Sequence, residues 1–277
     1  MIEIGKHSEL GIARETSVGL FLVDEEGEDV LLPNKYCPED YEIGDTLRVF
    51  VYLDHEERKV ATNLEPKILM NEFALLQVAD VSEIGAFLDW GLEKHLLVPF
   101  SEQRQKMALG RWYVVRLCFD EKTERLYASN KLNRFLNNDQ LDIKQNEKVD
   151  LLVYRETELG YGVIINNLHK GLIYGNEVFE PLDIGSQHIG YIKKIRTENK
   201  LDVSLKPIGF ENFNDANCNT ILIVLENNNG QIKLNDKSSP EEIYALLKMS
   251  KKAFKKAVGA LYKQKVLTIT DKGIKLI

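Results

Sequence analysis

The sequence predicts a mainly β chain in which three small five-stranded barrels are followed by an α/β domain. One pattern of apolar strands and turn glycines recurs three times before Pro207, and helical periodicity replaces it afterwards. Self-similarity along a chain indicates repeated structural units. The glycines that open corresponding strands, Gly44, Gly110 and Gly185, are 66 and 75 residues apart. This spacing exceeds that of a solenoid repeat and suits a small, complete barrel.

The first repeat shows the strand pattern in full. Gly19–Val23 is followed by an acidic turn at 24–29, and Val30-Leu31-Leu32 returns along it. Residues 46–52 alternate between apolar and polar types, and a charged turn leads to a last strand at 60–62. Short strands separated by regular turn signals predict a sandwich or barrel. Closure into a barrel removes the exposed strand edges of so small a unit.

The other two repeats follow the same order. We align Val18-Gly19-Leu20-Phe21 with Ile84-Gly85-Ala86-Phe87 and with Tyr161-Gly162-Val163-Ile164. Residues 131–136 are expected to pack on the second barrel, and the polar run 137–140 to be a linker. The predicted domains are barrels at 1–65, 66–137 and 138–208 and an α/β domain at 209–277.

Charge is distributed unevenly between the repeats and the C-terminal segment. The net charge is −7, but residues 237–277 hold ten lysines against three acidic side chains and so carry +7. The remaining residues carry −14. This balance argues against indiscriminate polyanion binding by the whole chain and places any basic face in the C-terminal segment.

Catalytic, metal and membrane signatures are missing from the sequence. Cys37, Cys118 and Cys218 are far apart, and the five histidines are scattered without metal-ligand spacing. No clustered carboxylates, phosphate loop or nucleophile elbow appears. No apolar stretch approaches the roughly 20 residues of a membrane span. We therefore expect a cytoplasmic, monomeric protein with reduced thiols, without enzymatic activity, metal or cofactor.

The C-terminal segment reads as helix, strand, two helices and hairpin, which is the order of a winged helix. Ser239-Pro240 begins the first of the paired helices, and residues 251–263 form the second, at the recognition position. The wing tip is expected at Asp271-Lys272-Gly273. Four lysines should lie on the surface of the recognition helix: Lys251, Lys252, Lys255 and Lys256. Lysines without arginine or asparagine at the helix start favour phosphate contacts over base reading.

The repeats resemble S1-type domains, which are five-stranded members of the oligonucleotide-binding fold family. The third is closest, through Gly160–Ile165, Lys170–Tyr174 and Leu201–Leu205. The resemblance implies that aromatic residues on the second and third strands face nucleic acid. The matching positions are Tyr161, Ile164 and Tyr174 in the third unit, Phe21 in the first and Phe87 in the second. The sequence is equally compatible with Phe21 and Phe87 being buried in the cores of their barrels instead of facing nucleic acid.

Cations near the third unit are candidates for phosphate contacts. They are Lys170, Lys193, Lys194, Arg196 and Lys206. Because charged residues on strands are often only a solvated face, their concentration in one repeat is the main argument for a role. The third barrel is therefore the predicted centre of binding, beside the lysines of the winged helix.

The complete order of three S1-like units and a winged helix resembles the bacterial conserved virulence factor B family. The segments 238–243 and 249–257 carry the most specific part of this resemblance. It implies a post-transcriptional regulator that binds single-stranded RNA, mainly through the third S1 unit and the winged helix. Two alternatives stay open: a regulator that binds duplex DNA through the winged helix, and a protein-binding scaffold with partners that the sequence does not name.

Overall fold

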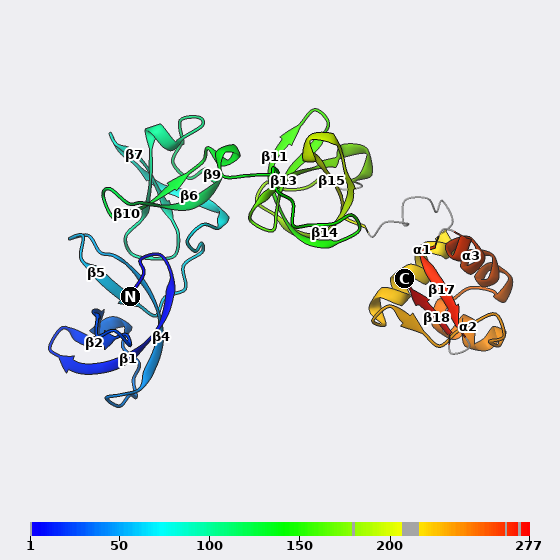
Figure 1. Ribbon diagram of the computed structural model, residues 1–277, viewed down its shortest axis with the longest axis horizontal. Coiled ribbons are helices and arrows are strands. Elements are labelled where there is room, and N and C mark those ends of the chain that lie inside the picture. Colours follow the sequence, from blue (N-terminus) through cyan, green and yellow to red (C-terminus); the bar gives the residue numbers. More distant parts are fainter. Residues whose placement is uncertain (1, 179–180, 207–215, 264, 271–272) are drawn as a thin grey trace. The chain divides into compact units, whose positions relative to one another are not determined.

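The computed structural model describes residues 2–178, 181–206, 216–263, 265–270 and 273–277 (Figure 1). Its first unit is a closed barrel with strand order β1-β2-β3-β5-β4. The strands are β1 (His7–Thr16), β2 (Gly19–Val23), β3 (Asp29–Pro33), β4 (Thr46–Leu53) and β5 (Lys59–Thr62). A parallel contact between Leu31 and Val60 closes the barrel. The predicted five-stranded unit is confirmed.

The second unit repeats this strand order. Its strands are β6 (Phe73–Val81), β7 (Gly85–Asp89), β8 (Leu96–Pro99), β9 (Trp112–Asp120) and β10 (Arg125–Ser129). They pair in the order β10-β9-β6-β7-β8, and the two end strands, β8 and β10, lie side by side as β3 and β5 do, without a hydrogen-bonded pairing within this stretch, all of which the structure describes. The predicted five-stranded unit is confirmed. The 3-10 turn Leu132–Arg134 follows, and Leu132 and Leu136 pack with Phe73 and Val114 as expected.

The third unit is again a closed barrel, in the order β11-β12-β13-β15-β14. Its strands are β11 (Lys148–Thr157), β12 (Gly160–Ile165), β13 (His169–Tyr174), β14 (Gln187–Ile195) and β15 (Leu201–Ser204). The polar run before it is not a free linker. The side chain of Asn138 is buried, and its amide accepts from the Lys170 N–H and donates to the Lys170 carbonyl, both at 2.9 Å. Residues 137–138 are thus held along β13.

The repeated glycines hold the same turn in each unit. Each glycine N–H donates to a carbonyl on the first strand: Gly44 to Ile12 at 2.8 Å, Gly110 to Val78 at 2.9 Å and Gly185 to Val153 at 2.6 Å. Their φ angles of +101°, +74° and +90° lie in the region that favours glycine. A β-bulge follows each of the three carbonyl residues on the first strand. The sequence repeat therefore corresponds to one local structure that occurs in all three units: a glycine turn hydrogen-bonded beside a β-bulge of the first strand.

The first and second units share a hydrophobic core. Trp90, which is 2% exposed, packs edge-on against Phe50 and Tyr52, with ring centroids 5.8 and 6.4 Å apart. The same cluster extends to Val60 in the first unit and Leu76 in the second. Aromatic pairs in this geometry add to the free energy of apolar burial. These two units are thus expected to be stable as a pair.

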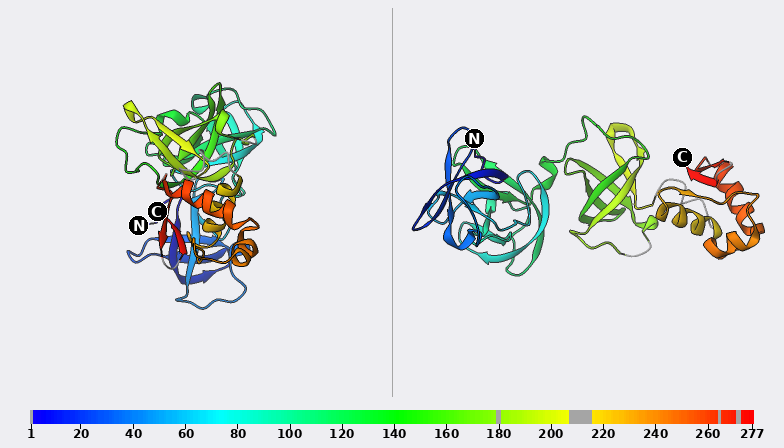
Figure 2. Two further views of the ribbon diagram at one scale, coloured as in Figure 1. Left: turned by 90° about the vertical axis from the view of Figure 1, so that its right-hand side faces the viewer. Right: turned by 90° about the horizontal axis from the view of Figure 1, so that it is seen from below.

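The C-terminal domain has the predicted winged-helix order and is coloured yellow to red in Figure 2. Its elements are α1 (Ala216–Asn227), β16 (Gln231–Ile232), α2 (Pro240–Leu247), α3 (Lys251–Lys263), β17 (Leu267–Thr270) and β18 (Gly273–Leu276). The Ser239 hydroxyl accepts from the Glu242 N–H, and the Glu242 carboxylate accepts from the Ser239 N–H, which makes a capping box at α2. Two residues of the expected wing tip, Asp271 and Lys272, lie outside the described residues.

Candidate nucleic-acid interface

Helix α3 has one buried and one charged face. Phe254, Ala257, Val258 and Leu261 recur at helical spacing and are buried in the core of the winged helix. The four candidate lysines lie off this stripe: Lys252, Lys255 and Lys256 are exposed, and Lys251 is half-buried. The Ser250 hydroxyl accepts from the Ala253 N–H at 3.2 Å and caps the start of the helix. The core therefore fixes which side of α3 carries the charge.

The positive charge of this face is not neutralised locally. Across the described part of the chain, Lys251, Lys252, Lys255 and Lys256 form no ion pair with a carboxylate. Uncompensated lysines on one face create a positive field that attracts phosphates and releases counterions on binding. This is the strongest basic surface that the sequence and structure together define.

An aromatic residue beside this helix was missed by the sequence reasoning. Tyr244 on α2 is 60% exposed, and the Lys248 ammonium lies 5.5 Å from its ring centroid. Lys248 ends α2 in a left-handed conformation, with φ of 51°. The signal was available, because Tyr244 falls between the inward-facing Ile243 and Leu247 and so points away from the core. An exposed ring next to a lysine is a surface on which a base can stack.

The third barrel offers fewer free cations than the sequence suggested. The Lys193 ammonium lies 2.6 Å from Glu177, and the Arg196 guanidinium lies 3.0 Å from Asp202. These two candidates are engaged within the barrel. Lys170 and Lys194 are exposed and stay available for phosphate contacts, and Lys206 is exposed too.

The three predicted apolar contacts of the third barrel have different surroundings. Tyr161 is the second residue of β12 and Tyr174 ends β13, and both side chains are half-buried, which leaves part of each ring accessible. Ile164 is 1% exposed and packs in a cluster with Leu136 and Leu152. The prediction that Ile164 contacts nucleic acid is therefore wrong, because its side chain is buried in the hydrophobic core.

Strand pairing also corrects the alignment of the third repeat. Thr16 pairs with Gly19 at the first hairpin, and Thr157 pairs with Gly160 at the third. Gly160, not Gly162, is thus the equivalent of Gly19. It follows that Gly162 occupies the position of Phe21 and Phe87.

The two phenylalanines of the first and second units meet different neighbours. Phe21 is half-buried, and the guanidinium carbon of Arg14 lies 4.0 Å from its ring centroid. Arg14 also donates to the Asp29 carboxylate at 2.7 Å, which holds it over the ring. Phe87 is half-buried and lines a cavity. The face of Phe21 is therefore covered, whereas that of Phe87 adjoins open space.

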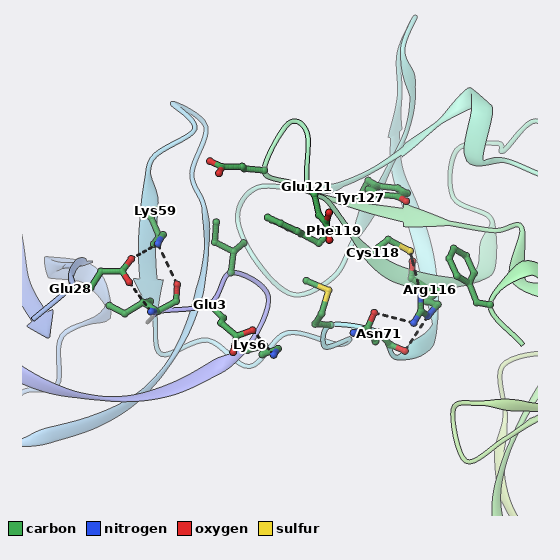
Figure 3. Close-up of a pocket in the computed structure, with 15 residues that line it drawn as sticks. Glu3, Lys6, Glu28, Lys59, Asn71, Arg116, Cys118, Phe119, Glu121 and Tyr127 are labelled. Atoms are coloured by element: carbon green, nitrogen blue, oxygen red, sulfur yellow. Dashed lines mark hydrogen bonds and ion pairs between the residues drawn. The ribbon is translucent and has the colours of Figure 1, made fainter. Parts of the chain in front are cut away.

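A larger hollow of about 700 Å³ is lined by residues of the first and second units (Figure 3). Lys59 is 2.5 Å from the Glu28 carboxylate, and this hydrogen bond is the main reason that the pKa of Glu28 lies below its ordinary value. Arg116 donates to the side-chain oxygen of Asn71 at 3.0 Å. Burial raises the pKa of the Cys118 thiol. With its cations engaged and four glutamates in the lining, this hollow is poorly suited to a polyanion.

Comparison with known proteins agrees with the domain order. A model described as "CvfB-like winged helix domain" matches residues 219–276, and one described as "S1 domain" matches residues 4–64. "Uncharacterized protein YitL" of Bacillus subtilis (strain 168) is 31% identical over 94% of this chain and 89% of its own. "Conserved virulence factor B" of Staphylococcus epidermidis (strain ATCC 12228) is 28% identical over 90% and 87%. The chain belongs to the conserved virulence factor B family.

One solved structure also aligns with this family member along its length. It is described as a multidomain protein with nucleic acid binding domains from Streptococcus pneumoniae TIGR4, and it is 27% identical. The alignment covers 99% of this chain and 98% of the other, with a TM-score of 0.45. The matched S1 and winged-helix models are nucleic-acid-binding domain types, and they support nucleic-acid binding by this family member.

In the part of the chain that the structure describes, no group of three or more His, Cys, Asp or Glu side chains is placed to hold a metal ion. Nor does any described helix combine the length and apolar character needed to cross a bilayer. The basic face of α3 and the aromatic positions of the barrels are thus the chemical features that carry the functional argument.

Proposed function

We propose that this protein is a non-catalytic, monomeric, cytoplasmic RNA-binding protein that regulates gene expression after transcription. Single-stranded RNA would be held by the third S1 barrel and the winged helix. The observation that carries the proposal is the set of four lysines on α3, none of which is ion-paired within the described residues. Tyr161 and Tyr174 supply half-exposed rings in the barrel.

Single-stranded RNA fits these groups better than a duplex does. Stacking of an unpaired base on an aromatic ring contributes about 1–3 kcal/mol, and a base inside a duplex cannot offer its face in this way. The lysines of α3 contact phosphates without reading base edges. Lys170 and Lys194, which are exposed in the same barrel, add phosphate contacts. Each domain alone would bind weakly, and the tether between them raises the effective concentration of the second site.

The salt dependence of binding tests the role of α3. We would measure fluorescence anisotropy of labelled single-stranded RNA, single-stranded DNA and duplex DNA at several salt concentrations. For a single strand, each phosphate contact contributes about 0.7 to the slope of log affinity against log salt. The variant K251A/K252A/K255A/K256A should bind RNA more weakly and with a shallower slope.

A matched control removes the same charge elsewhere. Lys106, Arg111, Lys122 and Lys131 are exposed in the second unit, outside the proposed site, so their joint replacement by alanine should leave the slope nearly unchanged. Equal slopes for the two quadruple variants would overturn the assignment of α3. Preference for duplex DNA would favour a transcription regulator, and failure to bind any of the three polymers would favour a protein scaffold.

Catalysis is tested separately. Labelled RNA would be incubated with the purified protein and magnesium or manganese, and its length followed over time. The proposal expects intact RNA. A shortened product whose formation co-purifies with the protein would contradict it.

A further inference from the structure

On the first strand of each unit, one residue follows the β-bulge, and its type differs in one of the three units. Pairing places Arg14 opposite Phe21, Arg155 opposite Gly162 and Asp80 opposite Phe87. In the first unit the guanidinium covers the ring. In the third, a Cβ atom on Gly162 would lie 2.9 Å from Cγ of Arg155, so the arginine side chain covers that position too. Only the second of these three equivalent positions carries an acid in place of the arginine.

A cavity of about 330 Å³ is lined by residues of the first and second units, Asp80 among them. Its apolar lining includes Ile84, Phe87, Trp90 and Leu97. Ile84 is 59% exposed, as are Val18 (57%) and Leu159 (65%) before the corresponding hairpin glycines. Ligand pockets start at about 300 Å³, so this volume suits a single nucleoside rather than a folded segment.

The Asp80 carboxylate is available to a ligand. Its Oδ1 accepts from the Val81 N–H at 2.8 Å, and no described cation forms an ion pair with it. A carboxylate presents two oxygens that accept two parallel N–H donors. Guanine carries such a pair on one edge, at N1 and N2, and so offers the same donor pattern as a guanidinium. Adenine and uracil lack it.

The charges around the cavity favour a base over a partner's arginine. Lys94 and Arg125 both line the cavity, and both pair with the Glu57 carboxylate, at 3.1 and 3.0 Å. With Asp80 the charged lining sums to zero when both histidines are neutral, and Lys94 and Arg125 supply the positive side chains that a nucleotide phosphate can approach. His55 and His95 also line the cavity and add positive charge when protonated.

We infer that this cavity is a binding site for one guanine, with the base against Phe87 and its N1–H and N2–H donors on Asp80. The site goes beyond the proposed function, because it lies between the first and second units and selects one base by its hydrogen-bonding edge. A free guanine nucleotide and a guanine within RNA present the same edge. The experiment must therefore separate these two sources.

Calorimetric titration of the full chain with GMP, AMP and UMP, and with guanosine, tests the inference. GMP should bind at least about tenfold more tightly than AMP or UMP, since a bidentate pair discriminates by roughly that much. Asp80→Asn, which keeps one acceptor, should remove most of this preference. Asp80→Arg recreates the arrangement of the other two units and should abolish binding. Glu121→Gln makes the same change of charge as Asp80→Asn at an exposed site outside this cavity and should bind like the unaltered protein.

Two comparisons show whether the ligand is a free guanine nucleotide or a guanine within RNA. Binding of free GMP that depends on Asp80 supports a nucleotide site. Discrimination by Asp80 only between guanine-containing and guanine-free RNA oligonucleotides supports a base within RNA. Equal binding of all nucleotides, or an Asp80→Asn variant with unchanged preference, would overturn the inference. So would Asp80-dependent binding of N-acetylarginine amide without binding of guanine.

Separate variants distinguish a failure of the guanine-site inference from a failure of the proposed RNA-binding function. The α3 quadruple variant should retain its affinity for GMP, because none of its four lysines lines the cavity. Asp80→Asn should retain the salt slope of RNA binding, because it removes no phosphate contact. Asp80 is exposed, so circular dichroism and thermal melting of each variant should confirm that the fold is intact.

Discussion

The carbonyl oxygen of Leu32 lies directly over Gly19, so that a Cβ atom added there would be only 2.1 Å from it. The same relationship links Gly85 with Val98 at 2.2 Å and Gly273 with Ile232 at 2.0 Å. In each case the strand that begins with the glycine pairs closely with its neighbour. Glycine is therefore required by the approach of two backbones, which no side chain can relieve by changing rotamer.

Gly19→Ala should destabilise the first unit strongly. The added methyl group forces the two strands apart, and we expect a loss of about 3 kcal/mol in the free energy of unfolding. Urea denaturation followed by circular dichroism would measure it. Gly11→Ala is the control, because its Cβ would meet nothing closer than 3.9 Å. Similar losses for the two variants would contradict the steric explanation.

The aromatic contact between Trp90 and Phe50 predicts that the first two units unfold together. Trp90→Ala leaves a cavity in their shared core and should cost about 3–5 kcal/mol. Trp112 is 54% exposed, so Trp112→Ala should cost much less and serves as the control. Hydrogen exchange would show whether protection falls in both units. Loss of protection confined to the second unit would argue against a shared core.

Most of the fold could be predicted from the sequence, because helix caps, apolar spacing and turn residues agree with the observed packing. Helix α3 has the predicted bounds, since Ser250 caps it and its apolar spacing is regular. The strands were found because turn residues bound short apolar runs, although some strands, such as β4 and β15, bury four consecutive residues rather than alternating. The missing hydrogen-bonded pairing between β8 and β10 was not predicted, because pairing between distant strands depends on tertiary packing rather than on any local pattern.

The register of the third repeat shows where sequence reasoning failed. Gly160 and Gly162 are two residues apart, and a shift of two preserves the alternation of inward and outward side chains. A local signal separates them: the Thr16 hydroxyl donates to the Gly19 carbonyl at 2.7 Å, and Thr157 to Gly160 at 2.9 Å. The Thr-x-x-Gly spacing thus marks the hairpin. The burial of Ile164 has a different cause, since it depends on tertiary packing.

Asp89 should contribute a pH-dependent part of the stability. A hydrogen bond from Lys67 at 2.5 Å, then one from the Gly91 N–H, holds the pKa of Asp89 below its ordinary value. The folded protein therefore favours the charged form, and this stabilisation is present above the unfolded-state pKa and is lost as the pH falls through the folded-state pKa. Because both side chains are partly exposed, it should amount to less than about 1 kcal/mol.

Asp89→Asn would show this contribution as a difference between two unfolding curves. The variant should be less stable than the unaltered protein at pH 7, and the gap should close below about pH 4. Glu25→Gln, at an exposed position without an ion pair in the described residues, is the control and should show no such convergence. A gap that persists at low pH would mean that the substitution acts through packing instead.

Removal of the Tyr161 and Tyr174 rings should lower the affinity for RNA without changing the salt dependence of binding. Stacking contributes about 1–3 kcal/mol per base, so replacing both tyrosines with leucine should weaken binding by roughly tenfold or more. The slope of log affinity against log salt should stay unchanged, because no phosphate contact is removed. The matched control replaces both residues with phenylalanine, which keeps the rings and should keep most of the affinity. If the leucine and phenylalanine variants bind equally, the rings do not stack on bases; if the slope falls instead, the barrel contributes through its lysines.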